Sequence, residues 1–191
     1  MRKWLLLGLM LWITACSSGP QTTSFIGTDI TGAEFGKPLT LTDHTGKLRS
    51  MTDFKDKVVV LFFGYTHCPD VCPTTMSDLK QTMRLLGSDA DQVQVLFVTV
   101  DPERDTQEVL AQFVPSFDKR FIGLTGSLQE VSENMGSYKI FASKVMGEGR
   151  GNYTVDHSAG LYVFDKTGAA RIYMNYGQKP ADIAHDIKQL L

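Results

Sequence analysis

Two cysteines, Cys68 and Cys72, follow the apolar run 58–63, which the sequence predicts to be a buried strand. Three cysteines occur in the 191 residues, and the third, Cys16, lies in the N-terminal leader. If both downstream thiols lie on one helix, their Cα atoms are about 6 Å apart, within the range of a disulfide. Two thiolates at that separation can also share a soft metal ion such as copper(I) or zinc. The pair therefore indicates either a redox couple or a metal site.

The helix that would carry these thiols is predicted by apolar residues at helical spacing: Met76, Leu79, Met83 and Leu86. It ends at Gly87, and Pro69 suits its first turn because proline needs no N–H partner there. A thiol at the start of a helix meets unpaired N–H groups and the positive end of the helix dipole. We therefore expect the pKa of such a cysteine to be lowered.

The remaining elements follow from periodicity and turn residues. We predict strands over 58–63, 93–100 and 121–124, helices over 106–113, 128–138 and 181–191, and hairpins over 38–51 and 161–176. Two βα units followed by a hairpin and a terminal helix predict an α/β, thioredoxin-like fold with an N-terminal β-hairpin and an inserted helix-rich segment. In such sheets reactive groups gather at the carboxyl ends of the strands. Both cysteines and Asp101 fall at such ends.

The third ligand of a metal site is sought among four histidines. His157 precedes a predicted hairpin strand, in a loop that faces the dithiol in a thioredoxin-like fold, so it is our candidate. His67 adjoins Cys68, where it would tune the thiolate rather than bind the same ion. The other two are expected to be solvated, one in a hairpin turn and one on the last helix: His44 and His185. Two cysteines and one histidine leave zinc short of its usual four ligands, whereas three-coordinate copper accepts them.

Asp101 has two interpretations. It ends the second predicted strand near the dithiol, where it could act on bound copper or on a proton. It could equally belong to the turn that enters the next helix, with Asp105 or Thr106 as the N-cap.

The N-terminal leader has the pattern of an export signal. Arg2 and Lys3 precede an apolar run that is shorter than the roughly 20 residues of a membrane span, and small residues precede Cys16. We predict a lipoprotein signal peptide over 1–15, and a lipidated Cys16 with a flexible tether over 16–24. A cleavable signal with an incidental cysteine is the alternative. The protein would then be lipid-anchored in a bacterial cell envelope and face the periplasm, at the inner or the outer membrane.

Composition limits the remaining possibilities. Residues 25–191 have the length of one domain, and the formal net charge is −2 with no basic run beyond the leader. The electrostatic pattern of nucleic-acid binding is therefore missing. Outside the cytoplasm dithiols tend to oxidise, so a pair that stays functional there needs a reductant or a metal.

Three segments, 64–74, 100–106 and 155–158, resemble the Sco/SenC family of copper-binding, thioredoxin-like proteins that assist copper-site assembly in cytochrome c oxidase. The resemblance spans the whole domain 25–191. It implies Cu(I) or Cu(II) bound by Cys68, Cys72 and His157. It also implies two partners: a cuproprotein client such as an oxidase subunit, and a reductant or copper donor protein. The chain departs from many family members in its anchor, which looks like a lipid rather than a membrane-spanning helix.

Two function classes remain. The first is a copper chaperone or metallo-insertion factor, which binds and delivers copper without turnover. The second is an enzyme, an extracytoplasmic thiol-disulfide reductase that keeps client cysteines reduced, with Cys68 attacking and Cys72 resolving. Redox enzymes of this fold usually have two residues between their cysteines. The three residues found here, together with His157, favour the chaperone.

Overall fold

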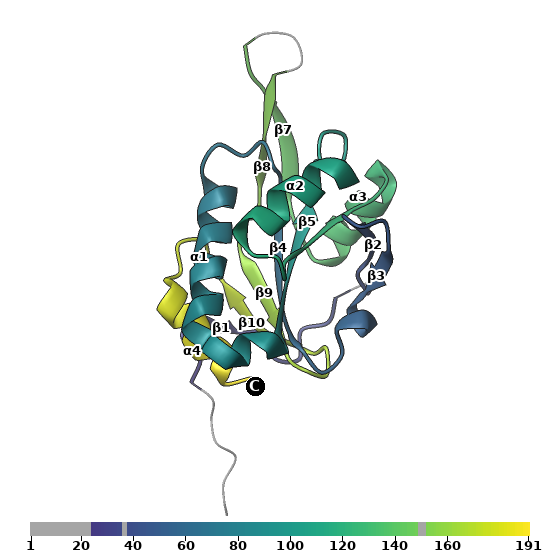
Figure 1. Cartoon of the computed structure of the whole chain (residues 1–191). Helices are drawn as coiled ribbons and strands as arrows, with labels where there is room; N and C mark the ends of the chain where they lie inside the picture. The colour runs from purple at the N-terminus through teal and green to yellow at the C-terminus, as the bar shows by residue number, and fades with distance from the viewer. Residues whose placement is uncertain (1–23, 36–37, 149–151) are drawn as a thin grey trace, which may run out of the picture.

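The computed structural model describes residues 24–35, 38–148 and 152–191 of the chain (Figure 1). The predicted signal peptide, Cys16 and the tether up to residue 23 lie outside this range. Among the described residues, no helix is long and apolar enough to cross a membrane.

Within the described residues, ten strands form two sheets. The strands are β1 (Thr28–Asp29), β2 (Thr40–Asp43), β3 (Leu48–Ser50), β4 (Val58–Gly64), β5 (Val93–Thr99), β6 (Ile122–Thr125), β7 (Ala142–Met146), β8 (Tyr153–His157), β9 (Leu161–Phe164) and β10 (Ala170–Met174). Eight of them form one sheet in the order β1-β10-β9-β4-β5-β6-β2-β3, while β7 and β8 pair with each other in a second sheet.

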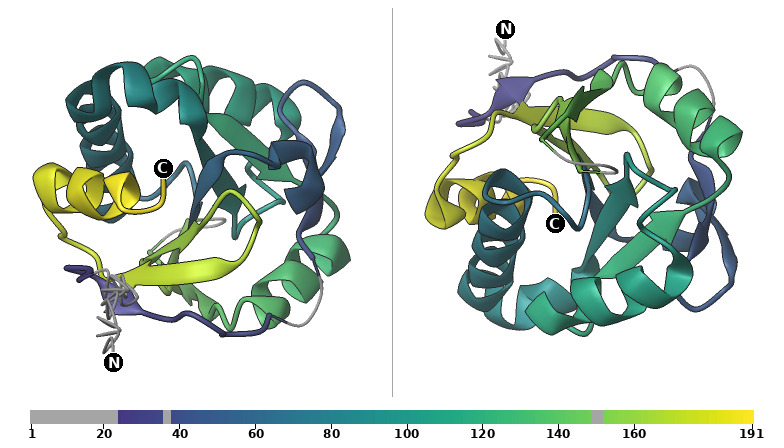
Figure 2. Two further views of the ribbon diagram at one scale, coloured as in Figure 1. Left: turned by 90° about the horizontal axis from the view of Figure 1, so that it is seen from below. Right: turned by 90° about the horizontal axis from the view of Figure 1, so that it is seen from above.

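The part of the chain that the structure describes has four α-helices, α1 (Val71–Leu86), α2 (Gln107–Phe117), α3 (Leu128–Ser137) and α4 (Pro180–Lys188), and two short 3-10 helices, η1 (Met51–Phe54) and η2 (Gly87–Gln92). Helices α1, α2 and α4 cover one face of the large sheet, and α3 lies on the other (Figures 1 and 2). The order of strands and helices agrees with the predicted α/β, thioredoxin-like fold. The predicted N-terminal hairpin is present as β2 and β3.

The centre of the large sheet is formed by β4 and β5, which run parallel and are buried along their whole length. Their continuous apolar sequences are typical of strands covered on both faces. Neighbouring side chains of β4 point to opposite faces, so Phe62 contacts Phe97 at a ring-centroid distance of 5.9 Å and Phe63 contacts Tyr138 at 5.6 Å. Because the two strands end side by side, the segments that leave them are also neighbours.

The hairpin of β7 and β8 was not predicted. It projects from the upper end of the molecule in Figure 1, above the carboxyl ends of β4 and β5. Four of the five residues of β7 are exposed, so the strand has no alternation of apolar and polar residues for a sequence pattern to detect. The prediction that His157 lies in a loop is therefore wrong, because His157 is the last residue of β8.

The start of α1 also differs from the prediction. The helix begins at Val71 with Asp70 as N-cap, so Pro69 precedes the helix instead of occupying its first turn. Pro73 is the proline that lies within the first turn, where its missing N–H group costs nothing because the first four amides have no partner inside the helix. Cys68 therefore lies in the turn before α1, and only Cys72 is helical.

Candidate metal centre

The cysteine loop connects the end of β4 to α1. The amide of Cys68 donates to the carbonyl of Tyr65 at 3.3 Å, and the amide of Cys72 donates to the sulfur of Cys68 at 3.4 Å. Both cysteines are free thiols. Cys68 is half-buried and Cys72 is completely buried. One sulfur is therefore accessible from outside, and the other is held inside the protein.

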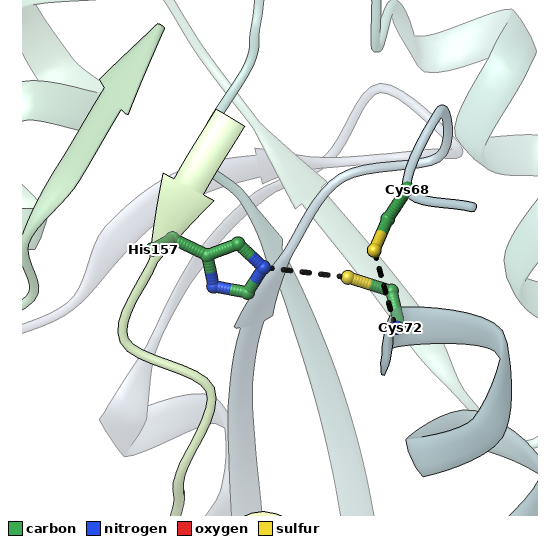
Figure 3. A group of neighbouring side chains, drawn as sticks. All are labelled: Cys68, Cys72 and His157. Atoms are coloured by element: carbon green, nitrogen blue, oxygen red, sulfur yellow. Dashed lines mark hydrogen bonds between the residues drawn. The ribbon is translucent and has the colours of Figure 1, made fainter. Parts of the chain in front are cut away.

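His157 approaches these sulfurs from the end of β8, as Figure 3 shows. Its Nε2 lies 3.5 Å from the Cys72 sulfur, and its Nδ1 lies 3.0 Å from the carbonyl oxygen of Ser158. Because a carbonyl can only accept, the neutral ring carries its proton on Nδ1. The lone pair of Nε2 is then directed to the sulfur, which is the arrangement of a histidine ready to bind a metal.

The three side chains can converge on one ion. The ligand atoms of Cys68, Cys72 and His157 all lie within 4.8 Å of one another. Bonds of about 2.3 Å from an ion to each of three ligands place the ligands about 4.0 Å apart in a trigonal site. The group therefore fits a three-coordinate metal ion after movements of less than about 1 Å.

Burial controls the protonation of the site. It raises the pKa of the Cys72 thiol strongly, and the neighbouring Cys68 adds to the increase. Our expectation of a lowered pKa is therefore wrong for Cys72, because loss of hydration outweighs the helix dipole at a sulfur with no exposed surface. Burial also lowers the pKa of His157, so its ring is neutral at pH 7. A positive ion would remove the cost of a buried thiolate, which makes this a place for a cation.

Close packing behind the site depends on Gly64, the last residue of β4. A Cβ atom at this position would lie 2.9 Å from the Cys72 sulfur and 2.9 Å from the ring of Phe97. Such distances are too short for carbon in contact with sulfur or carbon. The absence of a side chain at Gly64 is therefore what lets the helix and its sulfur approach the strand.

Tyr65 connects the two sides of the site, and our reasoning from sequence did not select it. Its hydroxyl accepts a hydrogen bond from the amide of Val155 in β8 at 3.1 Å. Its ring meets the ring of His157 edge-on, at a centroid distance of 5.8 Å. Burial raises the pKa of Tyr65, so the hydroxyl stays protonated at neutral pH. The sequence signal that could have selected Tyr65 is its position inside the segment 64–74, which carries the family resemblance.

An open cleft of about 300 Å³ lies beside the metal centre. Cys68 and His157 line it together with Tyr65, Pro69 and Val71. The cleft gives solvent or a partner access to the accessible sulfur and the imidazole, while Cys72 lies behind them.

The other histidines lie outside the metal group. The prediction that His44 is solvated is wrong: it is half-buried, and its Nδ1 accepts a hydrogen bond from the amide of Gly123 at 3.0 Å. His185 is exposed, as expected, with 47% of its side chain accessible. The side chain of His67 is 53% exposed and lies 3.9 Å from a carboxylate oxygen of Asp105.

Asp101 is a buried residue of the turn between β5 and α2. Its carboxylate accepts hydrogen bonds from Arg104 and Tyr153. Thr106 is the N-cap of α2, and its hydroxyl accepts from the amide of Val109. The second of the two interpretations of this segment is therefore confirmed for Thr106. Asp101 does not belong to the group of possible metal ligands among the described residues.

The fold and the site together define a class of protein: a thioredoxin-like domain in which two cysteines and one histidine converge on a site for a soft metal ion. Residues 27–191 match the SCO1/SenC family, and the chain belongs to this family. The resemblance noted in the sequence is thereby confirmed.

Three relatives illustrate the similarity. The copper-bound structure of ScoI from Bradyrhizobium japonicum is 40% identical, with a TM-score of 0.76, covering 83% of this chain and 100% of that one. The solution structure of apo Sco1 from Thermus thermophilus is 35% identical, with a TM-score of 0.78, covering 90% of this chain and 99% of that one. The mitochondrial SCO2 homolog of Danio rerio is 39% identical over 150 residues, which are 78% of this chain and 54% of that protein. The chain thus spans about half the length of this relative.

Proposed function

We propose that the protein is a copper chaperone or metallo-insertion factor. It binds one copper ion, Cu(I) or Cu(II), through Cys68, Cys72 and His157, and delivers the ion or electrons to a cuproprotein such as the copper site of cytochrome c oxidase. The observation that carries this proposal is the convergence of two sulfurs and one imidazole nitrogen within 4.8 Å. The similarity to a copper-bound ScoI supports the choice of copper.

The residues have distinct tasks in such a protein. Cys72 is the inner ligand, and burial ensures that its thiolate persists only while a cation compensates its charge. Cys68 is the outer ligand and borders the cleft, where the thiolate of a partner can replace it. His157 presents a neutral ring and can bind without losing a proton. Transfer would therefore begin at the cleft and end with reprotonation of Cys72.

A thiol-disulfide reductase remains the second candidate, because the two sulfurs are unequally exposed. Half-buried Cys68 could attack a client disulfide, and buried Cys72 could resolve the mixed disulfide. His157 has no necessary part in that exchange. A donor of copper and a reductant of copper-site cysteines would serve the same client.

The location and domain boundaries belong to the same proposal. We infer a signal peptide over 1–15, lipidation at Cys16, a tether over 16–24 and a copper-binding domain over 25–191, anchored in a bacterial cell envelope and facing the periplasm. The leader pattern supports this inference. The Cys16→Ala variant should move from the membrane fraction to the soluble fraction, and unchanged membrane association would contradict the anchor.

The decisive experiment is an anaerobic copper titration of the reduced full chain in detergent. The wild type should bind one copper ion and show thiolate-to-copper charge-transfer absorption. Cys72→Ser and His157→Ala should each weaken binding greatly. His185→Ala is the matched control, since it removes an exposed histidine outside the metal group. A wild type that binds no copper but exchanges disulfides readily would establish the reductase instead.

A further inference from the structure

The turn between β5 and α2, residues 101–105, lies between the two segments that carry the metal ligands. We propose that this turn is a double clamp: Asp105 positions the cysteine loop, and Asp101 together with Arg104 positions β8 and therefore His157. The inference rests on the proposed function, because it assigns positioning residues to the same site. Neither carboxylate would touch the ion.

The first arm of the clamp holds the cysteine loop. Asp105 is completely buried and accepts three hydrogen bonds. The amide of Thr66 donates at 3.0 Å and its hydroxyl at 2.6 Å, while the hydroxyl of Thr99 donates at 2.7 Å. Thr66 precedes Cys68 by two residues, and Thr99 is the last residue of β5. The carboxylate thus fixes the first turn of the cysteine loop to the central strand.

The second arm holds the hairpin. The hydroxyl of Tyr153, at the start of β8, donates to Asp101 at 2.8 Å. Arg104 donates through Nε to the same carboxylate at 2.5 Å and through Nη1 to the carbonyl of Tyr153 at 3.0 Å. The guanidinium carbon of Arg104 lies 3.5 Å from the centroid of the Tyr153 ring, a cation–π contact. Tyr153 is therefore held through its ring, its hydroxyl and its backbone.

Both arms are attached to one short, rigid piece of backbone. The amides of Arg104 and Asp105 donate to the carbonyl of Asp101 at 3.2 and 2.9 Å. The carbonyl of Asp105 in turn accepts from the hydroxyl of Thr125 at 3.0 Å. The two carboxylates therefore cannot move independently, and their relative position sets the relative position of the segments that they hold.

The hairpin needs such a clamp because its own pairing does not locate it. Strands β7 and β8 pair with each other, outside the eight-stranded sheet. The polar contacts from the domain body are those of the clamp, the bond from Val155 to Tyr65, and an ion pair between Lys144 and Glu103. The rings of Phe62 and Tyr65 also contact the ring of His157. Glu103 also belongs to the turn. The turn thus supplies most of the polar contacts between the domain body and the hairpin that ends in His157.

The first test concerns the histidine arm. Tyr153→Phe removes the hydroxyl and keeps the ring, and copper affinity should fall by roughly 10- to 100-fold, as for other residues that orient metal ligands. The nitrogen hyperfine signal of His157 in the Cu(II) protein should weaken. In a His157→Ala background the same substitution should change the affinity by less than about threefold, because the ligand that it positions is absent. A general structural role would give the same loss in both backgrounds.

The second test concerns the cysteine arm. Asp105→Asn leaves an amide that cannot accept all three bonds, and it should reduce copper affinity in both the wild-type and the His157→Ala backgrounds. If that variant fails to fold, Thr66→Val removes one of the three hydrogen bonds to Asp105 and should give a smaller loss of the same kind. Asp165→Asn is the matched control: Asp165 also forms a carboxylate turn bonded to an arginine, Arg171, but outside the metal group.

A metal-free measurement separates this inference from the proposed function. In NMR spectra of the reduced protein, Tyr153→Phe should shift or broaden the ring signals of His157 and leave the Cys68 amide in place, whereas Thr66→Val should do the reverse. This pattern supports the clamp even if the wild type binds no copper, in which case the proposed function fails. Unchanged ring signals in Tyr153→Phe, or equal copper losses caused by Tyr153→Phe in the wild-type and His157→Ala backgrounds, would overturn the clamp.

Discussion

The eight-stranded sheet and the β7–β8 hairpin supply the residues of the candidate metal centre in different ways. The sheet delivers the cysteines from a strand that is buried along its whole length, followed by a helix whose inner cysteine has no exposed surface. The hairpin delivers His157 from a two-stranded sheet that is mostly exposed. The comparison teaches that the two cysteines are held by the core of the large sheet, whereas His157 is held by two ring contacts and by polar contacts to its exposed hairpin.

The largest effect should come from a substitution in the packed core of the eight-stranded sheet. Phe97 is completely buried in β5 against Phe62 and Phe113. Phe97→Ala should lower the free energy of unfolding by about 3 to 5 kcal/mol, because it removes apolar contacts and leaves a cavity. Chemical denaturation monitored by circular dichroism measures this change. A loss below about 1 kcal/mol would show that the core repacks around the site.

A smaller effect is expected where the sheet touches the site. Gly64→Ala would force a Cβ atom against the Cys72 sulfur and Phe97, at a cost of about 1 to 3 kcal/mol. Copper affinity should fall as well, since the sulfur must move. Gly136→Ala is the control, because a Cβ atom there meets nothing within 4 Å and alanine favours the helix. Thermal unfolding with and without copper would compare the two, and a harmless Gly64→Ala would contradict the close approach.

Acid should weaken the sheet through Asp43 in β2. Burial raises the pKa of this carboxyl, but hydrogen bonds from Thr45, Arg49 and Lys47 outweigh it and hold the pKa at about 2. An unfolded aspartate has a pKa of about 3.9. The folded carboxylate therefore adds about 2 kcal/mol to the free energy of unfolding above that pKa, and this stabilisation is lost as the pH falls through 2. Denaturant titrations from pH 5 to pH 2 should show the free energy of unfolding decreasing with this slope against pH. Asp43→Asn should flatten it, and an unchanged slope would rule out this carboxylate as its source.

The smallest effect belongs to the exposed hairpin. Val145 in β7 is 44% exposed, so Val145→Ala should change the free energy of unfolding by no more than about 0.5 kcal/mol. Hydrogen exchange should also be faster in β7 and β8 than in β4 and β5, because the small sheet buries few apolar contacts. Equal protection of the amides from hydrogen exchange in the two sheets would show that the hairpin is held as firmly as the large sheet.

Much of the sheet could be predicted from the sequence, and the reason lies in the same contrast. Strands β4 and β5 are continuous apolar runs, and α1 has apolar residues at helical spacing. The residue types alone therefore indicate which parts of these elements are buried. The hairpin is exposed and lacks such a pattern. The start of α1 was misplaced because two prolines, Pro69 and Pro73, both suit a first turn, and only the backbone shows which one occupies it.

The candidate site was predictable in part. Cys68 and Cys72 were selected by type and spacing, and the relation of His157 to them followed from the predicted fold. The contacts of Asp105 with Thr66 and of Asp101 with Tyr153 span 39 and 52 residues of the sequence. Local periodicity carries no information about such pairs. Buried polar side chains far apart in the chain are found only when the fold brings them together.

Cys72 and His157 are separated by 85 positions in the chain. An ion bound to both would act as a cross-link that closes a long loop, and in the chain-entropy treatment of disulfides a loop of this size stabilises a fold by about 4 to 5 kcal/mol. Any ligand that binds only the folded state also raises the melting temperature. The melting temperature would therefore report what fraction of the protein holds an ion. If the protein delivers copper as we propose, the copper-free molecule left after delivery would melt at a lower temperature.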